Sequence, residues 1–252
     1  MWLQRKVPGH PATDLLPGPD GARLARRIAE AAHKLHEAGV PAGRRHTIGD
    51  ELRILDRCLA RVAAEHSALA TRLARLRIAC ERIAARIPHG RPRPIHRDFY
   101  GDQVIVDGAR LYVVDFDLYC VGDSALDIGN FLGHMTEQAL RTFGDPSALD
   151  GPEEVLEERF CELAGEGVRS AVRGYATLTL ARHVYLSTLL PERRVLTAPL
   201  LALCEERLLA PRPRRAAPDR GFQAPSRVES GNVLERPSES KGNSEALIAR
   251  FS

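Results

Sequence analysis

The stretch IHRDFYGDQVIVDGARLYVVDFDLYCVGDSALDIGNF, residues 95–131, decides the fold of this chain. It is the most strand-like part of a sequence that elsewhere carries helical patterns or polar, proline-rich segments. It also holds a dense set of acids together with a carboxamide and a histidine: His96, Asp98, Gln103, Asp115, Asp123 and Asp127. We expect any chemistry of this protein to take place here.

Within this stretch, two short β-branched and apolar runs predict a hairpin. Residues 104–106 and 111–114 are joined through an Asp-Gly pair at 107–108, the strongest short signal for a tight β-turn. A hairpin brings its two ends together, so Gln103 and Asp115 should emerge side by side. Two hard oxygen donors at one mouth suit Mg²⁺.

The composition is that of an ordinary globular protein and indicates neither a nucleic-acid nor a membrane partner. Of the 252 residues, 44% are hydrophobic and 27% are charged, and the formal net charge is only +3. The five cysteines are scattered without a CxxC pair, so they predict small buried side chains rather than a disulfide framework or a zinc site. No apolar run approaches 18 residues and no signal-peptide pattern is present, which predicts a cytoplasmic location.

The rest of the sequence predicts helices flanked by two irregular ends. Prolines and glycines interrupt residues 1–19, and Pro, Arg, Ser, Gly and Glu dominate residues 211–252, which predicts a disordered tail. Between them lies a mainly helical region, 20–210, with the hairpin at 95–117. The predicted helix starts are Asp20, a capping box of Thr47 and Asp50, Ser67, Asp123 and Pro152.

The order of motifs in residues 95–131 resembles the catalytic and metal-binding loops of the protein-kinase-like superfamily. These motifs are His-Arg-Asp at 96–98, a carboxamide five residues after Asp98, a hairpin, and Asp-Phe at 115–116. The continuation, with Val-Asp-Phe-Asp at 114–117 and Leu-Asp-Ile at 126–128, is similar to the aminoglycoside phosphotransferase and choline kinase-like family of small-molecule kinases.

That resemblance implies a fold and a reaction. The fold is the large C-terminal lobe of a kinase-like protein, mainly α with a small β-hairpin (α+β). The reaction is transfer of the γ-phosphoryl group of ATP, or another nucleoside triphosphate, to a small-molecule hydroxyl in the presence of Mg²⁺. Asp98 would be the catalytic base and Asp115 a metal ligand, with Gln103 as the second ligand. His96 would support the loop, and Asp127 would hydrogen-bond the loop backbone from the following helix.

Several residues depart from the family pattern or keep an ordinary structural reading. Gln103 stands where the family usually has Asn, so its oxygen must sit differently around a metal that tolerates poor geometry badly. Asp117 occupies a glycine position and is equally consistent with contact to metal or substrate and with a solvent-exposed role. Arg97 is expected to pack the loop or to face substrate. A late helix that carries Tyr175, Arg182 and His183 could line an acceptor cleft, but core or surface packing is predicted for these residues.

A nucleotide cradle is missing from the sequence. No Gly-rich hairpin precedes residue 95, and the lysines Lys6, Lys34 and Lys241 lie outside any strand that could grip phosphates. Residues 1–9 resemble the connector between the two lobes of the family, so the chain begins where a small lobe should have ended. We therefore expect the 252-residue chain alone to bind ATP poorly and to show little turnover.

Three readings remain open on the sequence alone. The first is the large lobe of a small-molecule phosphotransferase. The second is a stand-alone binding or scaffolding module whose interlobe face is covered by a separate chain. The third is a metal-dependent hydrolase that uses Asp98, Asp115 and Asp117 without a nucleotide; the spacing fits this third reading less well.

Overall fold

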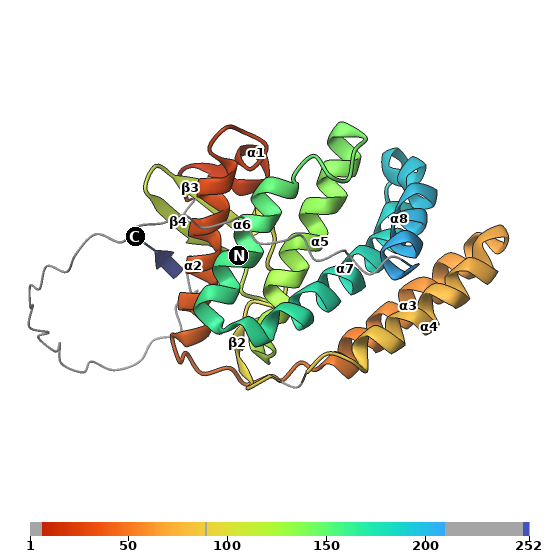
Figure 1. Cartoon of the computed structure of the whole chain (residues 1–252), viewed down its shortest axis with the longest axis horizontal. Helices are drawn as coiled ribbons and strands as arrows, with labels where there is room; N and C mark the ends of the chain where they lie inside the picture. Colours follow the sequence, from red (N-terminus) through yellow and green to blue (C-terminus); the bar gives the residue numbers. More distant parts are fainter. Residues whose placement is uncertain (1–6, 89, 210–248, 252) are drawn as a thin grey trace, which may run out of the picture.

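The computed structural model describes residues 7–88, 90–209 and 249–251, and helices dominate this part of the chain (Figure 1). The helices are α1 (Ala12–Leu15), α2 (Gly21–Glu37), α3 (Ile48–Glu65), α4 (Ala70–Ala84), α5 (Ser124–Phe143), α6 (Asp150–Ala164), α7 (Arg169–Leu189) and α8 (Thr197–Leu209). Short 3₁₀ segments are η1 (Ser67–Leu69), η2 (Gly101–Gln103), η3 (Glu166–Val168) and η4 (Pro191–Leu196). The strands are β1 (His10–Pro11), β2 (Arg93–Ile95), β3 (Val104–Asp107), β4 (Arg110–Val113), β5 (Cys120–Gly122) and β6 (Ala249–Phe251). The predicted mainly α architecture with a small hairpin is confirmed.

The hairpin lies where the sequence predicts it. Strands β3 and β4 pair antiparallel, with Val104 opposite Val113, and Gly108 takes a φ of 55° in the turn between them. Strand β1 adds to β3 and β6 adds to β4, giving the order β1-β3-β4-β6. A second pair, β2 with β5, ties the start of the 95–131 stretch to its middle.

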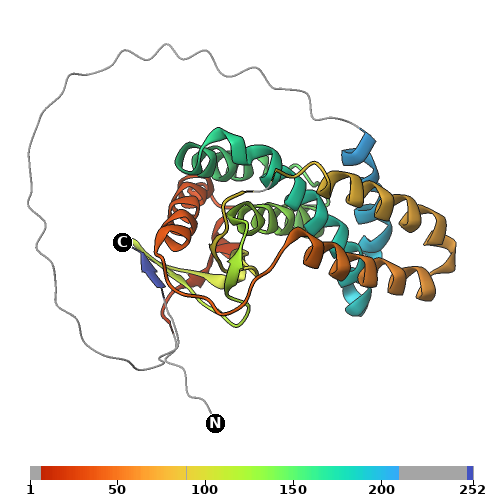
Figure 2. The same ribbon diagram turned by 90° about the horizontal axis from the view of Figure 1, so that it is seen from below.

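The helical core is built on the close packing of α5 against α7, with α2 against α6 beside it. Two glycines of α5 make the first approach possible. A Cβ at Gly129 would lie 2.4 Å from Cβ of Tyr175, and one at Gly133 would lie 2.7 Å from Cβ of Thr179. Helices α3 and α4 form an antiparallel pair that projects from this body, at the end away from β3 and β4 (Figures 1 and 2).

Two of the predicted caps form, the start at Asp20 is correct but lacks a capping bond, and two predicted starts need correction. Thr47 and Asp50 form the capping box of α3, and Asp123 caps α5 by accepting a bond from the Ala125 backbone. Asp20 stands at the N-cap position of α2 but makes no capping bond; its carboxylate instead accepts from the Arg23 side chain. Ser67 begins the 3₁₀ segment η1, so α4 starts only at Ala70. Helix α6 begins at Asp150, which places Pro152 inside its first turn, where a missing N–H costs little.

The N-terminal segment is more regular than predicted. Within 1–19, His10 and Pro11 pair with β3, and residues 12–15 form one helical turn directly after Pro11. Proline is compatible with this position because the first helical N–H groups have no intrahelical partner. Of the predicted tail, residues 210–248 and 252 lie outside the described residues, while 249–251 form β6.

The burial of most cysteines agrees with the prediction from the sequence. All five cysteines are free thiols, and four of them are buried. No helix within the described ranges combines the length and the apolarity that a membrane span requires.

Candidate active site

The mouth of the hairpin brings Gln103 and Asp115 together, as predicted. The backbone N–H of Val114 donates to the carbonyl of Gln103 at 3.0 Å, which closes the end of the hairpin. The amide Nε2 of Gln103 then lies 3.4 Å from Oδ2 of Asp115. Gln103 is buried and Asp115 is exposed. The Gln103 side chain is therefore held in the protein, whereas the Asp115 carboxylate faces solvent.

The donors at this mouth suit Mg²⁺. A half-turn of the Gln103 amide would present its oxygen instead of its nitrogen toward the space beside Asp115. Among the described residues there is no cluster of three or more His, Cys, Asp and Glu arranged to hold a metal ion. Mg²⁺ does not need one, because it commonly binds through one or two protein oxygens and takes its other ligands from water and substrate phosphates.

Backbone strain is concentrated at two positions of the site. Arg97 has a φ of 72° and Asp115 a φ of 64°, and these are the non-glycine residues with positive φ among those described. A left-handed conformation costs a non-glycine residue about 1 kcal/mol or more, so surrounding contacts must hold it. One strained residue, Arg97, directly precedes the predicted catalytic base, and the other, Asp115, is itself the predicted metal ligand.

Asp127 holds the first of these strained residues from beneath. Its carboxylate is fully buried on α5 and accepts from the backbone N–H of His96 at 2.9 Å and of Arg97 at 2.7 Å. The Nε2 of His36, on α2, lies 2.8 Å from the same carboxylate. The two backbone bonds are the arrangement that the resemblance implied. His36 was missed, because a histidine on a helix 91 residues away carries no sequence signal of this contact.

His96 ties the loop to the residue that precedes Asp115. Its backbone is anchored on Asp127, and its Nε2 lies 2.8 Å from the carbonyl of Val114. The ring also packs between Phe99 and Phe116, with centroids 5.8 and 4.9 Å away. The structure thus gives His96 a bracing position between the two halves of the site.

Asp98 is half-buried, and both of its neighbours are held in place. On one side the Arg97 N–H is bonded to Asp127; on the other, the Phe99 carbonyl accepts from Nδ2 of Asn130 at 3.1 Å. Asn130 lies one helical turn after Asp127, so one face of α5 carries both supports. Sequence reasoning missed Asn130, although the i, i+3 spacing of two polar residues in an apolar helix was a usable signal.

Tyr100 lies near Gln103 and the acids of the site. Gln103 Nε2 donates to this hydroxyl at 3.4 Å. The pKa of Tyr100 is raised, first by burial and then by the negative charges of Asp98, Asp102 and Asp115. On its other side the ring stacks on His134, with centroids 4.4 Å apart. Tyr100 therefore contacts both the metal-binding candidate Gln103 and His134.

The Asp117 side chain stays apart from this group. Asp117 is exposed, and its backbone carbonyl, rather than its carboxylate, accepts a bond from Nη2 of Arg44 at 2.6 Å. No hydrogen bond or ion pair joins its carboxylate to any residue that the structure describes. The two readings of Asp117 therefore both remain predictions.

The buried carboxylate of Glu51 links α3 to the loop that carries Asp98. Glu51 lies 2.6 Å from Nε2 of His46, 3.5 Å from Nη1 of Arg182 and 3.9 Å from Nε of Arg97. Burial alone would raise the pKa of Glu51, but the hydrogen bond from His46 and the nearby positive charges outweigh it and lower that pKa. Arg97 is thus a packing residue held by an ionised carboxylate, and α3 is linked to the loop through it.

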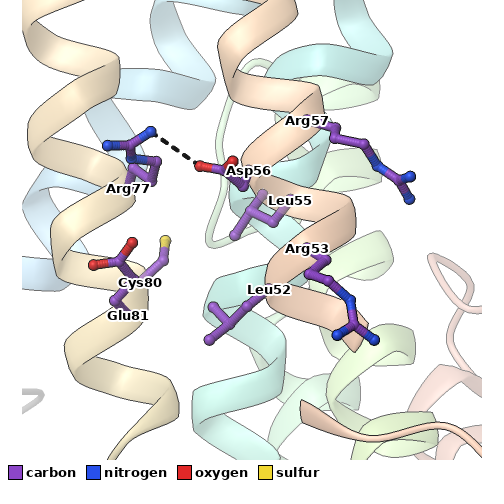
Figure 3. Close-up of a pocket in the computed structure, with 8 residues that line it drawn as sticks. All are labelled: Leu52, Arg53, Leu55, Asp56, Arg57, Arg77, Cys80 and Glu81. Atoms are coloured by element: carbon purple, nitrogen blue, oxygen red, sulfur yellow. Dashed lines mark hydrogen bonds and ion pairs between the residues drawn. The ribbon is translucent and has the colours of Figure 1, made fainter. Parts of the chain in front are cut away.

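Two pockets of about 380 Å³ each lie among the described residues, and the second of them borders the site. The first lies between α3 and α4, where Arg77 reaches across to Asp56 at 3.1 Å and Arg53 and Arg57 extend away from α4 (Figure 3). None of the predicted site residues lines it. The second, named here the Tyr100 pocket, lies beside the loop that carries Asp98. Its lining comes from the loop, α1, α5, α7 and η4: Thr13, Leu16, Tyr100, Gly101, Asp102, His134, Met135, Glu137, Gln138, Arg141, His183, Leu186, Leu189, Leu190 and Arg193.

His183 is packed in the interior, as predicted, and it also lines the Tyr100 pocket. Its ring contacts His134 edge-on, with ring centroids 4.4 Å apart. Arg182 is packed as well: its guanidinium bonds Oδ1 of Asn130 at 2.7 Å and pairs with Glu51.

Lowering the pH from 7.5 to 5.0 should destabilise the fold through His183. Burial, followed by the charges of Arg182, Arg193 and Arg141, lowers its pKa from 6.5 to about 3. The unfolded chain takes up this proton near pH 6.5 while the folded chain does not, so the contribution is complete above that pH and is lost as the pH falls toward 3. At pH 5.0 the loss approaches about 2 kcal/mol.

Urea denaturation at the two pH values measures this effect. A His183→Phe variant, which keeps a ring of similar size but cannot titrate, should lose less stability on acidification than the original chain. An equal pH dependence in both proteins would contradict the assignment to His183.

Comparisons with known proteins identify a family and similar folds. A family model described as the phosphotransferase enzyme family matches residues 1–163. A choline/ethanolamine kinase family protein from Mesorhizobium loti has a similar structure (TM-score 0.55, 17% identity, 80% of this chain and 67% of that one). So does a glucosamine kinase in complex with glucosamine, ADP and inorganic phosphate (0.54, 21%, 78% and 57%). An ethanolamine kinase from Plasmodium vivax is also similar (0.50, 14%, 82% and 63%).

These structural similarities concern the fold. The identities are low, and the chain spans between 57 and 67% of the length of these three structures. No curated protein matches the chain by sequence.

Proposed function

The chain belongs to the phosphotransferase enzyme family, and from this premise we propose that residues 95–117 form the catalytic and metal-binding half of a phosphoryl-transfer site. The reaction is transfer of the γ-phosphoryl group of ATP, or another nucleoside triphosphate, to the hydroxyl of a small molecule. The observation that carries this proposal is the convergence of Gln103 and Asp115, 3.4 Å apart, beside a loop that holds Asp98 between two anchored neighbours.

Asp98 has the role of catalytic base in this proposal. Phosphoryl transfer to an alcohol needs a carboxylate that orients the attacking hydroxyl and accepts its proton. The half-buried position of Asp98 leaves its carboxylate accessible, while the bonds to Arg97 and Phe99 fix the backbone on either side. Pre-organisation of this kind lowers the cost of placing the reacting groups.

Asp115 and Gln103 have the role of metal ligands, with Asp117 as a further candidate. Mg²⁺, when held by these residues, would offset the negative charge of the phosphates. His96 braces the loop against the backbone next to Asp115, and Asp127 and Asn130 hold the loop from α5. In this account the supporting residues act by position and do not touch the reacting atoms.

We further propose that the 252-residue chain is a weak catalyst by itself. Its sequence offers no Gly-rich hairpin and no strand lysine for the phosphates, and the chain spans only part of the length of the similar structures. Kinases typically turn over 1–100 times per second, and we expect less than ~0.01 per second for this chain. A stand-alone binding module, its interlobe face covered by another chain, is the second candidate function favoured by the same observation.

Transfer of radiolabel from γ-labelled ATP to a panel of small alcohols, sugars and amino alcohols tests the proposal. We expect slow transfer that requires both Mg²⁺ and ATP. Turnover in the ordinary kinase range would contradict the weak catalysis, and complete absence of transfer would favour the binding module. Mg²⁺-dependent hydrolysis of a phosphate monoester without nucleotide, abolished by Asp98→Asn, would favour a hydrolase instead.

A further inference from the structure

The Tyr100 pocket shares a wall with the candidate active site. The hydroxyl of Tyr100 accepts a bond from Gln103, and the ring of Tyr100 stacks on His134, which lines the pocket. Gly101 and Asp102, from the loop that carries Asp98, also line the pocket. If the proposed function holds, a small molecule bound here lies beside the loop that carries Asp98, the residue that would accept its hydroxyl proton. The chemistry of the lining then indicates the class of acceptor.

Two imidazole nitrogens in this pocket have unmet hydrogen-bonding capacity. Nε2 of His134 and Nε2 of His183 are both buried, and neither has a hydrogen-bond partner among the described residues. Buried polar atoms are almost always bonded, so an unpartnered pair facing a pocket points to a ligand or ordered water. A neutral imidazole offers a donor nitrogen and an acceptor nitrogen, which matches a hydroxyl group, itself both donor and acceptor.

The lining of the pocket carries two acids and two arginines, and the arginines act on the histidine end. Glu137 is bonded to Arg141 at 3.0 Å, so these two charges balance each other. Arg193 is half-buried and makes no ion pair with a described residue, whereas the acid Asp102 is exposed at the loop. Burial, together with the neighbouring arginine charges, lowers the pKa of both histidines, so both imidazoles stay neutral at pH 7. An ammonium group bound at the two histidines would therefore lie among arginine charges.

The rest of the lining is largely apolar. It includes a methionine of α5, leucines of α7 and the leucines that follow α1 and α7: Met135, Leu186, Leu189, Leu16 and Leu190. A ligand that fills this pocket meets both imidazole nitrogens and apolar side chains, which matches a molecule with both hydroxyls and C–H groups. The ring of a sugar or cyclitol has both, and a pocket of about 380 Å³ is large enough for one such ring.

We propose that the Tyr100 pocket binds an uncharged polyhydroxylated molecule, of the sugar or cyclitol class, as the phosphoryl acceptor and discriminates against amines. His134 and His183 bond its hydroxyls, and Arg193 disfavours a cationic group. The role of the bound molecule as phosphoryl acceptor rests on the proposed function. The binding preference itself can be measured without nucleotide or metal.

The test is binding of matched probes to the 252-residue chain by ligand-observed NMR and calorimetry. Glucose and galactose are compared with their 2-amino derivatives, with myo-inositol, choline and gluconate added. We expect at least one uncharged probe to bind, with its amino counterpart at least tenfold weaker. Equal or tighter binding of an amine, tighter binding of gluconate than of glucose, or no binding of any uncharged probe would each overturn the proposal.

Single substitutions test whether the probes bind in the Tyr100 pocket. His134→Phe keeps the stack on Tyr100 but removes Nε2, and should weaken the uncharged probe at least tenfold. Arg193→Glu should shift preference toward the amino sugar, while Arg194→Glu, an exposed neighbour outside the pocket lining, should not. Unchanged binding in both His134→Phe and Arg193→Glu would overturn the assignment.

The two proposals can fail separately. Probe binding without phosphoryl transfer would count against the proposed function alone. Phosphoryl transfer to amines in preference to neutral sugars would count against this inference alone.

Discussion

Replacing Asp115 by asparagine should weaken Mn²⁺ binding to the chain at least tenfold, which corresponds to about 1.4 kcal/mol or more. Mn²⁺ takes the same oxygen ligands as Mg²⁺ and can be followed by water proton relaxation. Asp115 is the carboxylate at the hairpin mouth, and the remaining donor there, Gln103, is uncharged. Removing the negative charge leaves a neutral donor pair at the hairpin mouth for a hard divalent cation, so much of the electrostatic attraction there is lost.

The matched control is Asp107→Asn, at the opposite end of the same hairpin, where the side chain belongs to the turn. It should bind Mn²⁺ as the original chain does. The same titration on Asp117→Asn decides whether that exposed acid touches the metal or faces only solvent. Equal Mn²⁺ affinity in the original chain and in Asp115→Asn would contradict the assignment of the hairpin mouth as the metal site.

Replacing Asp127 by asparagine should lower the free energy of unfolding by about 3 kcal/mol. The buried carboxylate accepts from the backbone N–H groups of His96 and Arg97 and lies against His36. An amide has one acceptor oxygen and one donor nitrogen, so the nitrogen would face at least one N–H donor. The variant therefore loses a charge-assisted bond and leaves a buried donor unpaired. Arg97, already strained at a φ of 72°, would lose its anchor.

Asp123→Asn is the matched control for this change. Asp123 lies four residues earlier and caps the same helix, and asparagine caps a helix about as well as aspartate. Urea denaturation followed by circular dichroism should therefore show a loss below about 0.5 kcal/mol for Asp123→Asn. A similar small loss for Asp127→Asn would mean that the backbone bonds to the loop contribute little to stability.

The sequence predicted the hairpin and its consequences well because local chemistry decides them. An Asp-Gly turn between two β-branched runs specifies the register, and the register alone places Gln103 beside Asp115. The helix after Asp123 was predictable for the same reason, since its cap and its apolar periodicity are adjacent in the chain. The position of Asp127 under the loop came from the family resemblance.

What the sequence could not provide were contacts between distant segments. His36 reaches Asp127 from α2, and Glu51 reaches Arg97 from α3, across sequence separations that no local pattern encodes. His134 and His183 meet only because α5 and α7 pack closely through the glycines of α5. The incorrect helix starts at Ser67 and Pro152 have a simpler reason: a residue that is able to cap or begin a helix is not always the one used.

The measurement that tests the central claim most directly is phosphoryl transfer by the chain and by Asp98→Asn under identical conditions. Long incubations with γ-labelled ATP, Mg²⁺ and the hydroxyl panel detect slow transfer, and urea denaturation confirms that both proteins are folded. Because a positioned base typically contributes 10²- to 10⁴-fold, the account predicts that Asp98→Asn reduces transfer at least a hundredfold. Transfer that persists at the original rate in a folded Asp98→Asn chain would contradict it.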